Sequence, residues 1–190
     1  MGYNIKDVFY LSTSTDIAAS TSNGGSAQLD LSAYIDPIAR GRTKGTGLAI
    51  YKVHWIVSQA ANGEPIDDAE AGSFRAGLLA GAGFGDLATG GLTATSAGFQ
   101  ATNSLLVSEY DWYGPKSMIA NTNNTTATMM NPTLMPDTDV PYVVVRDNVC
   151  MVYEVGDHLT TKHTLSVRIE CAQISLDQST LNQLLRTQTV

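Results

Sequence analysis

The segment LAIYKVHWIV, Leu48–Val57, decides the fold class of this chain. Apolar and polar side chains alternate along it with a period of two, which is the repeat of a β-strand with one buried face. β-Branched and aromatic residues, which favour strands, supply most of the apolar positions. One face carries Ala49, Tyr51, Val53, Trp55 and Val57, whereas Lys52 and His54 lie on the other.

Strand patterns of the same kind recur on both sides of this segment. They are Val8–Ser12, Ala27–Ala33, Phe74–Ala80, Leu105–Trp112, Tyr142–Arg146, Val149–Val155 and Thr164–Leu176. With Leu48–Val57 they make eight strands, separated by turn residues and with almost no helix. The sequence therefore predicts an all-β, antiparallel, eight-stranded β-sandwich or barrel, and eight is the strand count of a single jelly roll.

The alternation also predicts core residues and local irregularities. We expect Tyr51, Val53, Trp55, Val57, Val167 and Ile169 in the core. In the last strand the apolar residues change phase between Cys171 and Ala172, which a β-bulge would absorb. Asp147-Asn148 could close a two-residue hairpin, because both residues tolerate positive φ, or could lie within one long bulged strand.

The C-terminal segment is the one helical pattern. Asp177 or Ser179 can act as its N-cap, and the apolar residues Leu181, Leu184 and Leu185 follow at helical spacing. A short helix is therefore predicted after the last strand.

Long linkers join the strands, but strands resume after each one, so a single domain over residues 1–190 is expected. The linkers are Ser14–Ser26, Gly81–Ala101 and Tyr113–Pro141. The third holds several apolar residues that a solvated loop has little reason to carry: Met118, Met129, Met130, Leu134 and Met135. Either this loop covers its own sandwich as a lid, or it docks on another subunit. The five residues are thus candidates for a subunit interface.

Composition argues against several classes of function. The net charge is −7, and only 11 Lys and Arg residues are spread along the chain. Nucleic-acid binding relies on clustered basic residues, so direct binding to a genome is not expected. The N-terminal sequence MGYNIKDVFYLS has no signal-peptide pattern, and no apolar run is long enough to span a membrane. The two cysteines, Cys150 and Cys171, are expected either as reduced core thiols or as one cross-strand disulfide.

We recognise no motif for catalysis, a metal or a cofactor, so we expect no enzymatic activity and no cofactor. His54 is interpreted as a surface or interface residue. His158 and His163 could bind a metal with Asp157, but no zinc spacing is present, so a solvated turn is the simpler interpretation. The carboxylates Glu64, Asp67, Asp68 and Glu70 could hold Ca²⁺, although a solvated acidic loop is the simpler interpretation. Glu109 and Asp111 share a strand face, as a glycosidase acid/base pair would, but two carboxylates on a solvated strand face are the simpler interpretation.

Several segments together resemble a single-jelly-roll major capsid protein, similar to those of sphaerolipovirus-type icosahedral viruses. They are LDLSAYI, GLAIYKVHWIVS, PYVVVRDNVCMVYEVG and HTLSVRIECAQISLDQSTLNQLLRTQ. The resemblance is one of pattern and not of a diagnostic motif. It implies a protein made in the host cytoplasm that assembles into the virion shell. The implied partners are further copies of the chain, a second capsid protein and an internal viral membrane.

Two functions of other classes remain open. A carbohydrate-binding β-sandwich would read sugars with exposed aromatic residues such as Tyr110, Trp112 and Tyr113. A β-sandwich hydrolase would assemble its site from residues far apart in the sequence.

Overall fold

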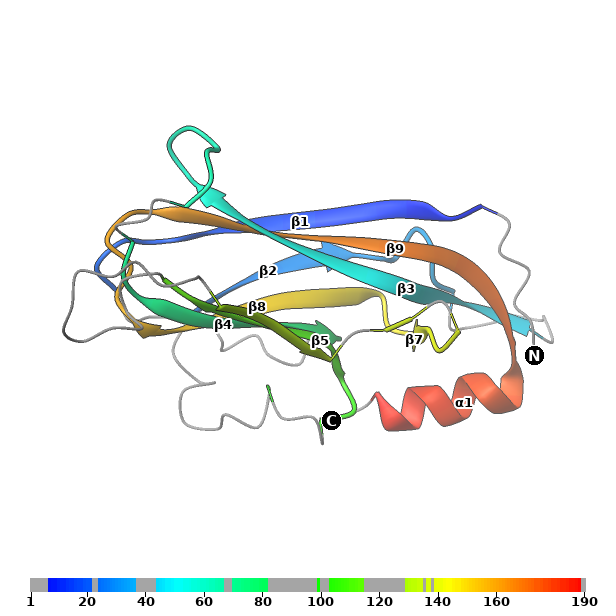
Figure 1. Ribbon diagram of the computed structural model, residues 1–190. Coiled ribbons are helices and arrows are strands. Elements are labelled where there is room, and N and C mark those ends of the chain that lie inside the picture. Colours follow the sequence, from blue (N-terminus) through cyan, green and yellow to red (C-terminus); the bar gives the residue numbers. More distant parts are fainter. Residues whose placement is uncertain are drawn as a thin grey trace.

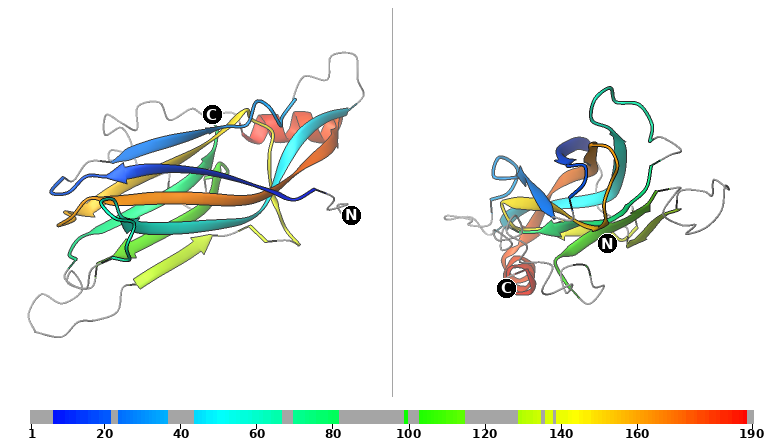
Figure 2. Two further views of the ribbon diagram at one scale, coloured as in Figure 1. Left: turned by 90° about the horizontal axis from the view of Figure 1, so that it is seen from above. Right: turned by 90° about the vertical axis from the view of Figure 1, so that its left-hand side faces the viewer.

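The structure is a computed structural model, and most of the residues that it describes form a pair of antiparallel β-sheets packed face to face (Figure 1). It describes residues 7–21, 24–36, 44–66, 70–81, 99, 103–114, 129–134, 136–137 and 139–188, with the backbone alone for 129–134. The first sheet has the order β1-β9-β3-β7 and the second the order β2-β8-β4-β5-β6. In the left view of Figure 2, β1, β9 and β3 lie side by side in the first sheet.

The described strands match the eight predicted segments and add one. The first sheet holds β1 (Phe9–Ile17), β9 (His163–Asp177), β3 (Lys44–Gln59) and β7 (Tyr142–Val144). The second holds β2 (Gly25–Asp30), β8 (Asn148–Asp157), β4 (Ser73–Ala80), β5 (Leu106–Tyr113) and β6 (Met129–Leu134). The added strand is β6, which lies in the predicted Tyr113–Pro141 loop and pairs with β5 at the sheet edge.

The strand pairing is that of a jelly roll. β1 pairs with β9, β2 with β8, β3 with β7, and β4 with β5, all antiparallel. These pairs are nested, as if one long hairpin had been rolled so that its successive pairs alternate between the two sheets. The predicted all-β antiparallel sandwich is confirmed, with β6 as an extra edge strand.

The main core lies between the two sheets. Val53, Val167 and Ile169 are each 1% exposed and belong to it, as predicted. Trp55 and Val57 are partly buried and pack against its rim. Trp55 Nε1 donates a hydrogen bond to Ser108 Oγ at 3.0 Å, which satisfies the polar atom that a buried indole carries.

The predicted bulge lies in β3 instead of β9. The register passes from Ile50 opposite Cys171 to Lys52 opposite Glu170, so Tyr51 is the additional residue. Tyr51 therefore faces away from the main core and packs in a separate cluster with Ala49 and Ala172. The phase change in β9 has another cause: beyond Cys171, the opposite face of the strand becomes the buried one.

The C-terminal helix α1 (Gln178–Thr187) is part of the reason for that change of face. Its Leu181 is fully buried against Val145 and Leu176, with Leu184 and Leu185 partly buried beside them. Asp177 is the N-cap, and its Oδ1 accepts a hydrogen bond from Thr180 N at 2.8 Å. The helix prediction is confirmed, and Figure 1 shows α1 at one end of the sandwich.

Neither predicted arrangement of Asp147-Asn148 is correct. β7 belongs to the first sheet and β8 to the second, so the chain crosses between sheets at this point. The Asp147 carbonyl accepts a hydrogen bond from Leu31 N at 2.6 Å, which anchors the crossing to the end of β2. Local sequence could not distinguish a crossing from a hairpin, because both need the same turn residues.

Both cysteines are free and buried. Cys150 lies in β8 and Cys171 in β9, which belong to different sheets. Burial raises the pKa of the Cys171 thiol to about 12 and also raises the pKa of Cys150. Both are therefore protonated core thiols with little nucleophilic character.

Within the described residues, no helix is long and apolar enough to cross a membrane.

Candidate functional site

A group of charged side chains on the outer face of the second sheet centres on Arg75. In the strand register, Arg75 of β4 lies opposite Asp111 of β5 on one side and opposite Glu154 of β8 on the other. Side chains at opposed positions of neighbouring strands share one face and lie close together. Three neighbouring strands of the sheet, β8, β4 and β5, thus place one cation between two carboxylate positions.

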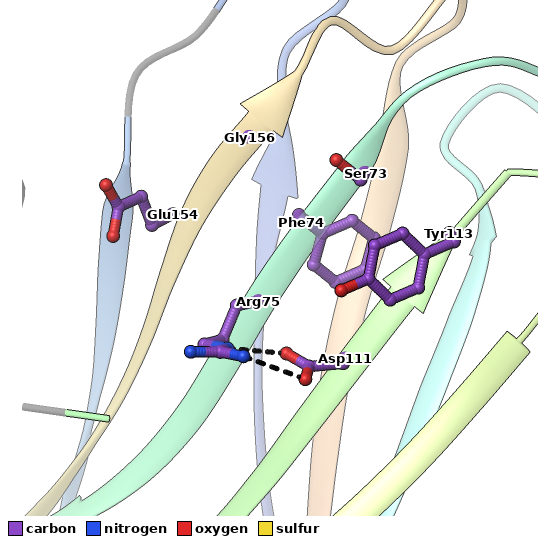
Figure 3. A pocket seen from close by; sticks show the side chains of 7 residues that line it. All are labelled: Ser73, Phe74, Arg75, Asp111, Tyr113, Glu154 and Gly156. Atoms are coloured by element: carbon purple, nitrogen blue, oxygen red, sulfur yellow. Dashed lines mark hydrogen bonds and ion pairs between the residues drawn. The ribbon is translucent and has the colours of Figure 1, made fainter. Parts of the chain in front are cut away.

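Arg75 binds Asp111 through two hydrogen bonds. Its Nε lies 2.6 Å from Asp111 Oδ1, its Nη2 donates to Oδ2 at 3.0 Å, and Nε also lies 3.1 Å from Glu109 Oε1. The hydrogen bond to Asp111 raises the pKa of Arg75. Figure 3 shows this pair with Glu154 directed away from it.

These contacts correct the expectation that Glu109 and Asp111 are solvated. They are only 7% and 9% exposed, respectively, and both are bound by Arg75. Both carboxylates face the Arg75 guanidinium, and Asp111 accepts a bidentate pair of hydrogen bonds from it. This geometry is that of a cross-strand ion pair.

A pocket of about 210 Å³ opens beside this ion pair. Its lining consists of Ser73, Phe74, Arg75, Asp111, Tyr113, Glu154 and Gly156. Tyr113 is 39% exposed, so it offers an aromatic surface next to charged groups. The other two aromatic residues predicted to be exposed are not: Tyr110 is 4% exposed and Trp112 is fully buried, because both point into the core.

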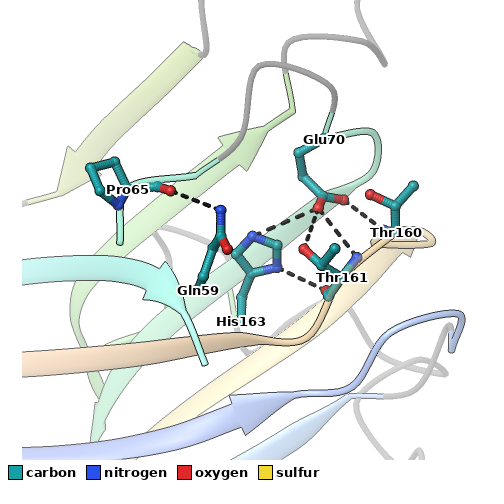
Figure 4. A network of polar contacts seen from close by, with 6 residues as sticks. All are labelled: Gln59, Pro65, Glu70, Thr160, Thr161 and His163. Carbon is teal, nitrogen blue, oxygen red and sulfur yellow. Dashed lines mark hydrogen bonds and ion pairs between the residues drawn. The ribbon is translucent and has the colours of Figure 1, made fainter. Parts of the chain in front are cut away.

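A second polar cluster lies within the protein at the β8–β9 turn (Figure 4). Glu70 is 1% exposed, and its carboxylate accepts hydrogen bonds from the backbone of that turn. Oε1 accepts from Thr160 N at 2.6 Å, while Oε2 accepts from Thr161 N at 3.2 Å and from Thr161 Oγ1 at 2.7 Å. A single buried carboxylate thereby satisfies donors that the turn would otherwise leave without partners.

His163 completes this cluster. Its Nδ1 lies 2.9 Å from the Thr161 carbonyl oxygen. A carbonyl oxygen can only accept, so the Nδ1–H group donates this hydrogen bond. Nε2 faces Glu70 Oε2 at 3.7 Å, close enough for an ion pair whenever the ring carries both protons. The imidazole lies 6.1 Å from the Trp112 ring, centroid to centroid.

Glu70 and His163 were both predicted to be solvated, and both predictions are wrong. His163 is 1% exposed because it begins β9 between β1 and β3, whereas His158 in the same turn is exposed as expected. His54 is exposed as well, and its Nε2 lies 3.0 Å from Glu170 Oε1 on the outer face of the first sheet.

No cation site forms in the part of the chain that the structure describes. Within it, no three His, Cys, Asp or Glu side chains lie close enough together to hold a metal. The oxygens of Glu70 are occupied by the β8–β9 turn. Asp67 and Asp68 lie outside the described residues, so the predicted alternatives for them stay open.

The interface candidates divide into two groups. Met129, Met130 and Leu134 belong to β6, where Met129 and Met130 lie opposite Tyr113 and Trp112 of β5. Met118 and Met135 lie outside the described residues. Whether these side chains form a lid or a docking surface stays a prediction.

The sequence analysis did not single out Arg75, and it assigned Glu70 to an acidic loop without identifying its role in the β8–β9 turn. Arg75 carries a usable signal, because it is the one charged residue within the apolar strand Phe74–Ala80 and alternation places it on the outer face. Glu70 carries no such signal, because its partners lie 90 residues further along the chain.

No protein-family model matches this sequence, and neither a curated protein nor a solved structure matches the chain.

Proposed function

We propose that this protein is a structural subunit that assembles, alone or with a second capsid protein, into an icosahedral viral shell. The jelly-roll topology supports the proposal but does not select it, because lectin domains and cupins share this fold. The observation that carries it is the outer face of β1, β9 and β3. This face is rich in hydroxyl groups, and most of its charged groups already have partners within the subunit.

The residues of this face follow from the strand register, which places alternate side chains outside. They are Tyr10, Ser12, Ser14, Asp16, Lys52, His54, Ile56, Ser58, Thr164, Ser166, Arg168 and Glu170. Two large apolar side chains stand exposed among them, Tyr10 at 52% and Ile56 at 54%. A neighbour can cover hydroxyl groups and isolated apolar groups at a lower desolvation cost than unpaired charged groups.

Most charged groups of the face already have partners within the subunit. Arg168 lies over the Tyr10 ring, with Cζ 4.3 Å from the centroid. Glu170 pairs with His54, and Asp16 pairs with Lys162 at 2.7 Å. The hydrogen bond from Lys162 lowers the pKa of Asp16. Unpaired charges are the groups that cost most to bury, so this pairing favours packing against another protein surface.

The proposal places the protein in the virion, with copies of itself and a second capsid protein as partners. A net charge of −7 argues against direct contact with the genome. An internal viral membrane remains a proposed neighbour of the shell.

The test is assembly of the purified protein, measured by sedimentation velocity and negative-stain electron microscopy. We expect concentration-dependent assemblies that Ile56→Lys weakens, because it adds an unmatched charge to the outer face. Val140→Lys is the matched control, since Val140 is 75% exposed, precedes β7 and is not one of the residues of this face. A protein that stays monomeric at every concentration, with or without a second capsid protein, would contradict the proposal.

The pocket beside Arg75 favours carbohydrate binding as a second candidate. Tyr113 offers a ring on which a sugar could stack, while Asp111 and Glu154 offer acceptors for its hydroxyl groups. A glycan array followed by calorimetry tests it. Specific binding to a monomer that is lost in Tyr113→Ala would favour this function over the shell.

A further inference from the structure

We infer that the outer edge of β1 pairs with β1 of a second copy of this chain, so that the sheet continues across a twofold axis at Thr13. The inference deepens the proposed self-association, on which it rests, by naming one contact and its partner. It starts from the backbone. β1 is an edge strand of the first sheet, and among the described residues no backbone group pairs with its outer side. A side chain reaches one end of the strand, where the Tyr153 hydroxyl donates to the Asp16 carbonyl at 3.1 Å.

An edge strand of this kind is a template for another strand unless something blocks it. β1 runs for nine residues in unbroken register with β9, without proline, lysine, glycine or a bulge. The other edges described are different. β7 has three residues, β2 has six, and β6 contains Pro132, which cannot donate to a neighbouring strand.

The sequence of β1, FYLSTSTDI, is compatible with antiparallel pairing to itself. An axis at Thr13 is the one position that overlaps the whole strand. It places Ser12 opposite Ser14 of the second copy, and Leu11 opposite Thr15 of the second copy. Hydroxyl side chains at opposed positions can form hydrogen bonds across strands.

Charge complementarity supports the same register. Tyr10 lies opposite Asp16 of the second copy, and the Arg168 guanidinium already covers the Tyr10 ring. Each Asp16, which is already paired with Lys162 of its own subunit, therefore also arrives beside an Arg168 of the other subunit. Within one subunit these two side chains do not meet, because Asp16 is opposite Thr164 and Arg168 is opposite Ser12. The two Asp16 carboxylates lie at opposite ends of the paired strands, so they do not repel strongly.

The first experiment is a cross-link. In this register the two Thr13 residues face each other directly, and opposed residues of antiparallel strands have Cα atoms about 4.5–5.5 Å apart, within disulfide range. Thr13→Cys is expected to form a disulfide-linked dimer under mild oxidation. Ser14→Cys is the matched control, because its two copies are offset diagonally by about 7–8 Å or more. Cross-linking of both variants or of neither contradicts the register.

The second experiment exchanges the charges. Asp16→Arg and Arg168→Asp should each weaken the dimer at least tenfold in sedimentation equilibrium, and the double variant should restore it. Thermal unfolding of each variant separates a folding defect from a lost contact. Failure of the double variant to restore the dimer, with folding intact, overturns the inference.

The outcomes also separate this inference from the proposed function. If the wild-type protein assembles but β1 neither cross-links nor responds to the charge exchange, the β1 contact is wrong and the shell proposal stands. If the wild-type protein never associates, both are wrong.

Discussion

At each end of the sandwich, one buried polar side chain forms hydrogen bonds with backbone groups of a turn or strand end, and the two side chains differ in charge. At the β8–β9 turn, Glu70 accepts hydrogen bonds from two backbone N–H groups, those of Thr160 and Thr161 (Figure 4). At the helix end, Gln188 accepts from Val145 N at 3.1 Å and donates to the Val143 carbonyl at 2.6 Å. Both residues are almost completely buried.

The difference follows from the backbone N–H and C=O groups that have no strand partner at each end. The turn presents donors, and a carboxylate is an acceptor only. The end of β7 presents one donor and one acceptor, which an amide matches. The backbone groups left without strand partners therefore decide whether the buried side chain that binds them is a carboxylate or an amide. Replacing Glu70 by an amide, or Gln188 by a carboxylate, should lower the free energy of unfolding.

The largest effect is expected at the charged end. Glu70→Ala leaves two backbone donors without acceptors and His163 without its carboxylate, so we expect a loss of about 3–5 kcal/mol in the free energy of unfolding. Glu70→Gln retains the shape but turns an amide donor toward N–H groups, and should lose about 1–3 kcal/mol. Urea unfolding measures both. A loss below about 1 kcal/mol for Glu70→Ala would show that solvent replaces the carboxylate.

The converse exchange at the neutral end should have a smaller effect. Gln188→Glu retains an acceptor for Val145 N but cannot donate to the Val143 carbonyl when ionised, so we expect a loss of about 1–3 kcal/mol in the free energy of unfolding. Gln183→Glu makes the same chemical change at an exposed position of α1 and serves as the matched control. Equal stability of the two variants in urea would show that the amide donor is dispensable.

The smallest effect concerns pH at the helix end. The hydrogen bond from Thr180 N lowers the pKa of Asp177 below its usual value. A carboxyl group with a lowered pKa in the folded state stabilises the fold fully above about pH 5, and this contribution is lost as the pH falls through the lowered pKa. Asp177→Asn should flatten that part of the stability–pH curve, measured by urea unfolding at a series of pH values. An unaltered curve for Asp177→Asn would contradict the prediction.

Sequence reasoning located the eight segments, the sandwich and the capped helix because each has a local signature. Alternation with period two marks strands such as Leu48–Val57, and a capping aspartate before leucines at helical spacing marks α1. β6 lacked this signature, because Pro132 interrupts it and the strand forms by pairing with β5. The position of the bulge was equally hidden, since an extra residue in either of two paired strands shifts their register by the same amount.

The amino-acid sequence by itself thus determined eight of the nine described strands, the short helix that follows them, and the antiparallel sandwich. Only the tertiary structure decided that Arg75 meets Asp111, that Glu70 closes the β8–β9 turn, and that β1 remains an open edge. The physical reason is range. Side-chain periodicity is set by neighbours in the chain, whereas burial, ion pairing and strand edges depend on which distant segments pack together.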